Sequence, residues 1–336
     1  MLENNEPIAE KQAMARFLPD FGDAEQPDAE QPDEYAVTQV VGRNRPAAGR
    51  IYGILLLLLS ALCWSISLVT AFMVSREGIT VNTSNTSRFL LATFVLLSYQ
   101  LLRKRPLRLS RDGQRYALTL GICGFFISFG YLTATQYIPV SLAVLLFYTA
   151  PFFVALMVRF IEHRELSNRK IAALALAFTG LSLALNLSED FHLSLIGISF
   201  ALLAGVSLAI LILLSARKGH LYDSVAVNIH VLGIASVLFI LVLVLSGDLT
   251  VPQSSATWGK LGVVGVAVAV AQLSMFIGVR YTGALLGAML MNFEPLFTVS
   301  LAILLIGEQL SALQMFGALL VISAVFMISW PSRSAT

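Results

Sequence analysis

Ten long apolar stretches between residues 51 and 330 constrain this chain more than any other feature. They cover 51–74, 86–102, 115–137, 140–161, 170–187, 194–215, 225–246, 259–280, 283–306 and 311–330. A helix of about 20 residues crosses about 30 Å of hydrocarbon. In lipid only helices and closed barrels satisfy their own backbone, and ten spans of this length exclude a barrel. The sequence therefore predicts an all-α, polytopic membrane protein with ten transmembrane helices.

The composition agrees with a lipid environment. The chain is 57% hydrophobic and 12% charged, whereas a soluble domain carries about 25% charged residues. Its two cysteines, Cys63 and Cys123, lie inside apolar stretches and lack CxxC spacing. We expect them to be small buried residues, not disulfide partners or metal ligands. No metal and no cofactor is expected.

Positive charges gather in alternate loops. The loop after the second stretch holds Arg103, Lys104, Arg105, Arg108 and Arg111. Arg217 and Lys218 follow the sixth stretch, while the opposite loops hold only Arg76 and Lys260, with Arg88 close by. Lysine and arginine accumulate on the cytoplasmic side of membranes. Both termini are therefore predicted to be cytoplasmic, in a multi-pass protein of the cell membrane (the inner membrane in a bacterium).

The first 50 residues differ in composition from the rest of the chain. The string AEQPD occurs twice in tandem at 24–33, and seven acidic residues lie between Asp20 and Glu34. Such a segment has too little apolar surface to fold. Residues 1–50 are predicted to be a disordered cytoplasmic tail, whose role is open. Residues 331–336 are predicted to be a short cytoplasmic tail at the other end.

The chain contains an internal repeat. The string YIPVSLAVLLFYTAPFF begins at Tyr137, and YTGALLGAMLMNFEPLF begins 144 residues later, at Tyr281. This offset is five spans, an odd number, so the second copy must enter the membrane in the opposite sense. Inverted repeats of this kind build many secondary transporters, with the substrate site near the midplane. We predict two inverted five-helix repeats, 51–187 and 194–330.

Short motifs along these repeats match a known family. They are Trp64-Ser65, Arg88-Phe89, Ala150-Pro151, Glu165-Leu166-Ser167, Glu294-Pro295 and Gly307-Glu308-Gln309-Leu310. By their order and spacing the chain resembles the EamA family of the drug/metabolite transporter superfamily. The resemblance implies a ten-helix fold and alternating access through a cavity lined mainly by helices 1, 3, 4, 6, 8 and 9. The chain departs from the pattern at His230, where the second repeat lacks an Arg-Phe pair.

Glu294 is the strongest candidate for a coupling residue. It lies in the middle of the ninth stretch, where a charged carboxylate costs about 2.5–3.5 kcal/mol on insertion scales. A carboxyl there could take up a proton on one side of the membrane and release it on the other. The alternative is a permanently protonated carboxyl that hydrogen-bonds a neighbouring helix. The sequence leaves both open.

Other candidates have a structural alternative as well. Pro151 and Pro295 each remove one backbone hydrogen bond at matched positions, which favours a static kink over a hinge. Arg88 could meet an anionic substrate group or extend to the membrane interface. His230 aligns with Arg88 in the second repeat and is expected to be neutral and hydrogen-bonded.

Four polar or aromatic side chains are expected to line a substrate path. They are Trp64, Tyr148, Gln272 and Asn292. Tyr148 and Asn292 lie three residues before the paired prolines, which is about one helical turn. Polar residues at Thr179 and Ser323, on spans 5 and 10, are expected to lie elsewhere. The alternative is that Tyr148 and Asn292 only satisfy the backbone groups that the prolines leave unpaired.

The sequence favours a secondary transporter that exports a small metabolite or amino acid, with proton coupling left open. The expected partners are that small molecule and the lipid bilayer, not nucleic acid, and the protein is a monomer or a homodimer. An uptake permease for a metabolite or nucleotide-like substrate is the alternative. A membrane-embedded enzyme is disfavoured because no GxGD, HExxH or GxSxG string occurs.

Overall fold

The computed structural model describes residues 47–138, 140–161, 167–184, 194–306 and 312–329, and these residues form helices and no strand. The helices are α3 (Ala47–Arg76), α4 (Val81–Leu102), α5 (Arg111–Ala134), α6 (Val140–Phe147), α7 (Ala150–Ile161), α8 (Asn168–Ala184), α9 (Leu195–Lys218), the 3-10 turn η1 (Gly219–Leu221), α10 (Ser224–Ser246), α11 (Ser255–Thr282), α12 (Ala284–Met291), α13 (Phe293–Ile306) and α14 (Ala312–Ser329). The all-α prediction is confirmed. Both predicted tails, Glu165 and Glu308 lie outside the described residues, apart from the first helical turn at 47–50.

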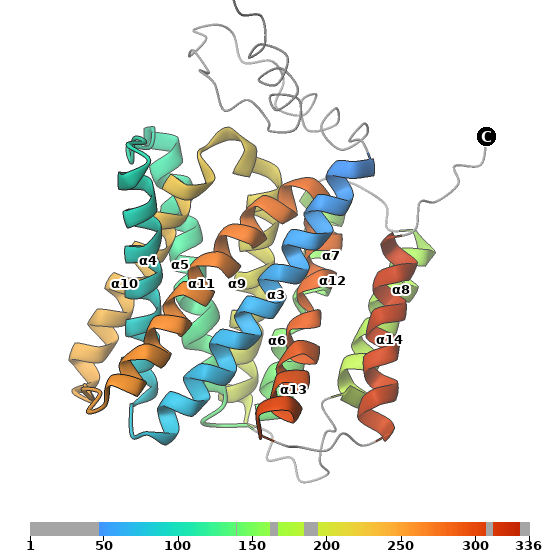
Figure 1. Ribbon diagram of the computed structural model, residues 1–336. Coiled ribbons are helices and arrows are strands. Elements are labelled where there is room, and N and C mark those ends of the chain that lie inside the picture. The colour runs from blue at the N-terminus through green and yellow to red at the C-terminus, as the bar shows by residue number, and fades with distance from the viewer. Residues whose placement is uncertain (1–46, 139, 162–166, 185–193, 307–311, 330–336) are drawn as a thin grey trace, which may run out of the picture. The chain divides into compact units, whose positions relative to one another are not determined.

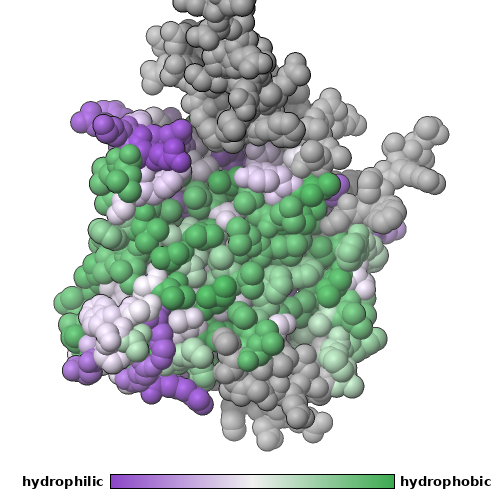
Figure 2. All heavy atoms as spheres, viewed as in Figure 1, coloured by the Kyte–Doolittle hydropathy of each residue, from purple (hydrophilic) through white to green (hydrophobic). Residues whose placement is uncertain are grey.

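Six helical segments in the described residues are long and apolar enough to cross a membrane. They are Gly49–Arg76, Arg111–Ala134, Leu142–Ile161, Leu195–Leu221, Ser224–Ser246 and Ser255–Thr282. Figure 2 shows a broad apolar band with hydrophilic side chains gathered beyond it. Such a band suits contact with lipid, so the protein is a multi-pass membrane protein. The count of ten spans stays a prediction.

Polar residues mark where these helices begin. The side chains of Thr80, Ser110, Ser194, Asp223 and Ser254 each accept a hydrogen bond from the backbone N–H three residues later. Each caps a helix whose first N–H groups have no partner within the helix. The caps explain why α4 begins at Val81, in the polar segment before the predicted 86–102 span.

Matched close contacts show that the repeat has the same packing twice. A Cβ atom added to Gly53 would lie 2.6 Å from the Cβ of Tyr281, and one added to Gly197 would lie 2.9 Å from the Cβ of Tyr137. The offset of 144 residues converts the first pair into the second, since 53 + 144 = 197 and 137 + 144 = 281. In both copies a glycine near the start of a helix makes room for a tyrosine side chain of the other repeat.

The two repeats run in opposite directions. At the start of α3, the Tyr52 ring meets the Tyr281 ring near the end of α11, with centroids 5.4 Å apart. At the end of α9, Gly219 lies next to Arg280, where an added Cβ would be 3.3 Å from the arginine side chain. The start of α3 therefore lies at the same end of the bundle as the end of α9 (Figure 1). Corresponding first helices are antiparallel, as an inverted repeat requires.

Both proline-containing spans have a short break in their α-helix. The chain breaks between α6 and α7 at Tyr148–Thr149, and between α12 and α13 at Asn292. At each break a backbone N–H donates to a carbonyl three residues back, at 3.2 Å. Pro151 and Pro295 then fall in the first turn of α7 and α13, where a missing N–H costs no helical bond. The static kink predicted at these prolines, and the alternative of a hinge, both stay predictions.

Helices α8 and α14 pack against each other through two glycines. A Cβ atom added to Gly317 would lie 2.3 Å from the backbone nitrogen of Ala184, and one added to Gly180 would lie 2.7 Å from the Gly317 carbonyl oxygen. Figure 1 shows this pair at one side of the bundle. The remaining helices of both repeats surround a central volume.

Candidate functional site

A cavity of about 210 Å³ lies between the two repeats. Its described lining comes from α3, α4, α5 and α6 of the first repeat, from α9 to α13 of the second, and from Tyr148 at the α6–α7 break. Neither α8 nor α14 contributes a described lining residue. The volume is below the roughly 300–1,000 Å³ of sites for drug-sized ligands, so the cavity suits a small molecule.

Two further helices contribute lining residues, although the resemblance does not place them among the main cavity helices. Helix α4, the second span, contributes Asn85, Arg88 and Phe89, and helix α10, the seventh, contributes Val231, Leu232 and Ala235. The expectation of a cavity lined mainly by spans 1, 3, 4, 6, 8 and 9 therefore has to be extended.

Many of the lining residues form pairs related by the repeat offset of 144. The pairs are Trp64 and Leu208, Arg88 and Leu232, Ser128 and Gln272, Tyr131 and Met275, and Phe147 and Met291. Corresponding backbone positions thus face the same cavity from the two repeats. This offset pairs Arg88 with Leu232, not with His230, which had been aligned with it from the sequence.

The paired positions differ in chemistry. In these pairs the first repeat supplies three aromatic rings, a guanidinium and a hydroxyl, whereas the second supplies leucine, methionine and an amide. Glu294 corresponds to the buried Ala150. Among the described lining residues, Arg88 is the one base and Glu294 the one acid. The cavity is therefore symmetric in its backbone and polarised in its charge.

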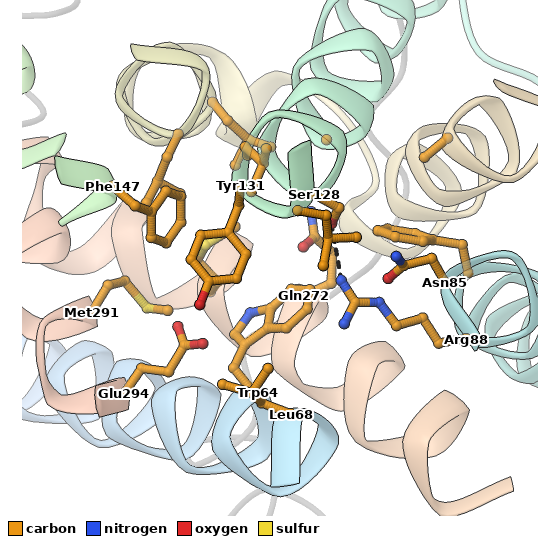
Figure 3. Close-up of a pocket in the computed structure, with 18 of the residues that line it drawn as sticks. Trp64, Leu68, Asn85, Arg88, Ser128, Tyr131, Phe147, Gln272, Met291 and Glu294 are labelled. Carbon is orange, nitrogen blue, oxygen red and sulfur yellow. Dashed lines mark hydrogen bonds between the residues drawn. The ribbon is translucent and has the colours of Figure 1, made fainter. Parts of the chain in front are cut away.

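Glu294 lies in the first turn of α13, directly after the chain break. The Ser65 hydroxyl donates to its backbone carbonyl oxygen at 2.7 Å, which fixes this turn against α3. Its carboxyl interacts with the Tyr148 hydroxyl. The Tyr131 hydroxyl also points toward this carboxyl (Figure 3). A carboxylate at a helix start is favoured by the helix dipole.

Arg88 lies on the α4 wall of the cavity. Its Nη2 atom donates to Ser128 Oγ at 2.9 Å, and its guanidinium carbon lies 5.8 Å from the Trp64 ring centroid and 5.2 Å from that of Phe89. Its Nε atom is buried and has no hydrogen-bond partner in the part of the chain that the structure describes. No salt bridge joins Arg88 to a carboxylate of the described residues. The guanidinium thus keeps unused donors.

The structure brings most of the predicted site residues to one place. Trp64, Arg88, Tyr148, Gln272, Glu294 and Pro295 line the cavity. Asn292 is 3% exposed and follows the lining residue Met291, but it is not itself part of the lining, and its Oδ1 has no hydrogen-bond partner among the described residues. Pro151 is buried outside the lining. Whether substrate passes these residues stays a prediction.

Sequence reasoning missed three polar lining residues, Asn85, Ser128 and Thr298. The offset of 144 pairs Ser128 with Gln272 and could have found it, and Asn85 lies about one turn before Arg88. His230 does not line the cavity. Its Nδ1 lies 2.8 Å from the Ala226 carbonyl oxygen, one turn back in α10, so this nitrogen carries a proton.

Comparison with known proteins agrees with this architecture. Residues 51–186 and 195–330 each match the EamA-like transporter family. An uncharacterized transporter of Archaeoglobus fulgidus is 28% identical over 243 residues, covering 71% of this chain and 85% of that protein. The pseudopaline exporter CntI of Pseudomonas aeruginosa is 26% identical over 284 residues, covering 82% and 95%. A solved crystal structure shares the fold with a TM-score of 0.71 at 18% identity, covering 85% of this chain and 97% of its own.

Proposed function

Because the chain belongs to the EamA-like transporter family, we propose that it is a secondary active transporter that moves a small metabolite or amino acid by alternating access. The observation that carries the proposal is the cavity between two antiparallel repeats, lined at matched positions by both. A site on the repeat axis can be exposed to either side when one repeat rocks against the other.

Export is the proposed direction of transport. It is supported by one relative, which is named an exporter of pseudopaline. The small cavity, with one base and one acid among its described lining residues, fits a metabolite or amino acid better than a nucleotide-like molecule. Several basic groups would be needed to neutralise the phosphates of a nucleotide. An assay that measures the direction of transport would contradict this proposal if it showed uptake.

Proton coupling through Glu294 is part of the same proposal. A carboxyl in a low-dielectric site is costly when charged and unpaired, so its proton occupancy can differ between the two access states. The Tyr148 and Tyr131 hydroxyls beside it can donate to the deprotonated carboxylate. A proton gradient would then drive the substrate across the membrane.

The test is transport in proteoliposomes, with a substrate selected by a thermal-shift screen of metabolites on the purified protein. Wild-type protein is expected to exchange labelled for unlabelled substrate and to accumulate it when a pH gradient is imposed. Glu294→Gln should lose the accumulation even at a substrate concentration high enough for it to exchange labelled for unlabelled substrate. Glu77→Gln, outside the cavity at the end of the bundle, is the matched control and should exchange and accumulate substrate as wild type does. Accumulation by Glu294→Gln with unchanged pH dependence would place coupling elsewhere.

The proposed orientation has both termini in the cytoplasm of a cell-membrane protein. It is supported by the five basic residues between 103 and 111 at one end of the bundle. Arg108 and Gln253 are exposed in loops after α4 and α10. On a background without Cys63 and Cys123, Gln253→Cys should react with an impermeant thiol reagent on intact cells, and Arg108→Cys should not. The opposite labelling pattern would reverse the orientation.

A further inference from the structure

The base and the acid of the cavity are separated. Figure 3 shows the Trp64 ring between Arg88 and Glu294. The two groups influence each other electrostatically, yet they form no salt bridge. A cavity that holds opposite charges apart in a low-dielectric site keeps unsatisfied interactions at both ends. A ligand with two unlike charges could complete both.

The Arg88 end is equipped for a carboxylate. A guanidinium has five N–H donors in a planar fork, and the described residues use Nη2 for Ser128 while Nε stays without a partner. The Asn85 Nδ2 atom, which belongs to a lining residue, is likewise buried and has no hydrogen-bond partner among the described residues. Unpaired buried donors are costly. A carboxylate accepts two parallel bonds from such a fork and could also take the amide donor.

The Glu294 end is equipped for an ammonium group. The Glu294 carboxyl and the hydroxyls of Tyr131 and Tyr148 gather there. All three groups offer oxygen acceptors to an ammonium, which has three donors and no acceptor. None of the described lining residues at this end is a base that would repel it.

The walls between the two ends are apolar. The first repeat presents the rings of Tyr131 and Phe147, whose centroids lie 5.8 Å apart, and the second presents the flexible thioethers of Met275 and Met291. Thioethers adapt to ligand shape and pack favourably on aromatic rings. The walls can therefore hold an apolar body of a few carbon atoms or one ring.

We infer that the cavity binds a zwitterion with an apolar body, its carboxylate at Arg88 and its ammonium at Glu294. This assignment rests on the proposed transport function and names its substrate class. A zwitterion adds no net charge to the low-dielectric site while it pairs both resident charges. A plain anion would leave Glu294 without a cation, and a plain amine would leave Arg88 without an anion, each at a desolvation cost.

The test measures binding to the purified, detergent-solubilised protein with three probes that share one ring. Phenylalanine carries both charges, 3-phenylpropionate lacks the ammonium, and phenylalanine amide lacks the carboxylate. Phenylalanine is expected to bind at least about tenfold more tightly than either partial probe, because each removes one charge-assisted contact. Equal binding of all three, or tightest binding of a partial probe, would overturn the inference.

Two variants give a crossed pattern that a general loss of structure cannot produce. Arg88→Gln should bind phenylalanine about 10- to 100-fold more weakly while its affinity for phenylalanine amide is unchanged. Glu294→Gln should lose phenylalanine affinity while its affinity for 3-phenylpropionate is unchanged. Arg115→Gln and Glu77→Gln, both outside the cavity, are the controls and should match wild type. If a variant does not fold, the wild-type probe series alone decides.

Binding and transport can fail separately. If zwitterions bind in this crossed pattern but are not moved by proteoliposomes, the substrate class stands and the transport function falls. If the protein transports a metabolite that is not a zwitterion and binds none of the three probes, transport stands and the inference falls.

Discussion

The two repeats of this protein share a packing scheme and differ in what they present to the cavity. Gly121 in α5 and Gly265 in α11 correspond at the offset of 144, and each allows a neighbouring helix to approach. The side chains that face the cavity do not correspond in kind. The first repeat contributes Arg88 and Trp64, where the second has Leu232 and Leu208.

The difference separates two requirements. Alternating access needs two halves that can exchange roles, and this requirement falls on the backbone and on small residues at helix contacts. Recognition of a polar molecule needs unlike groups at its two ends, and this requirement falls on cavity side chains. Substitutions that make the two repeats more alike in the cavity should therefore weaken ligand binding and leave the stability of the fold unchanged. Substitutions at the shared helix contacts should lower the stability of the fold.

The largest expected effect is at the shared glycines. A Cβ atom on Gly265 would lie 2.4 Å from the Cβ of Leu91, and one on Gly121 would lie 2.7 Å from the Cβ of Ile234. Gly121→Val and Gly265→Val should each destabilise the protein by about 1–3 kcal/mol through overpacking, seen as similar drops in melting temperature. Gly124→Ala has open space and should not destabilise. Unequal responses of the two valine variants would break the structural equivalence of the repeats.

The next largest effect is expected at Arg88, a charged residue that corresponds to Leu232 in the second repeat. Arg88→Leu gives the first repeat the residue of the second, and ligand affinity should fall about 10- to 100-fold. The melting temperature should stay the same or rise, because replacing a buried, incompletely paired charge by an apolar side chain is often neutral or stabilising. A large loss of stability would show that Arg88 holds the helices together instead.

A smaller effect is expected at the aromatic wall. Trp64→Leu copies Leu208, removing the ring that lies 5.8 Å from the Arg88 guanidinium. A cation–π contact contributes about 0.5–1 kcal/mol or more, so affinity should fall several-fold, while Trp64→Phe should keep most of it. The ratio of the two variants' dissociation constants, with Leu208→Ile as a control in the other repeat, measures the contribution of the ring.

The repeat itself could be predicted from the sequence because tyrosine and proline recur with the same spacing. The helices were predictable too, since a span in lipid must be both apolar and helical. The breaks in the helices at Tyr148–Thr149 and Asn292 could not be located from the sequence, because proline is compatible with either a bent helix or the first turn of a new one.

Side-chain partners were the least predictable part of the site. The contact between Arg88 and Ser128 joins α4 to α5, and a serine in an apolar helix more often bonds its own backbone. Ser236 does so with Leu232, at 2.7 Å. Glu294 could be singled out because a carboxyl in an apolar stretch is rare, whereas small hydroxyl residues are common there.

The two ends of the bundle extend the comparison beyond the cavity. At one end, Lys260 in α11 forms a salt bridge with Glu77 after α3. The offset of 144 maps Lys260 onto Tyr116, at the opposite end, where its ring stacks on that of Tyr222 with centroids 5.1 Å apart. The contact made by this pair of corresponding positions, Lys260 and Tyr116, is therefore ionic at one end and aromatic at the other.

The smallest predicted effect is the pH dependence of this ionic end. Hydrogen bonds from Lys260 and Thr257 lower the pKa of Glu77 below its ordinary value of 4.5. The stabilisation by these bonds is full above about pH 4.5 and is lost as the pH falls through the lowered pKa. Glu77→Gln should therefore melt below wild type at pH 7, by a small margin for a water-accessible pair, and the difference should shrink as the pH is lowered below 4.5.

Tyr116→Phe is the matched variant at the aromatic end. It keeps the ring stacked on Tyr222 and has no carboxylate to titrate, so its melting temperature relative to wild type should not change between pH 7 and the acid range. Salt should weaken the Glu77 effect through screening and leave the Tyr116 variant unchanged. If both variants respond alike to pH and salt, the two ends are held by the same forces, and the difference between the repeats is confined to the cavity.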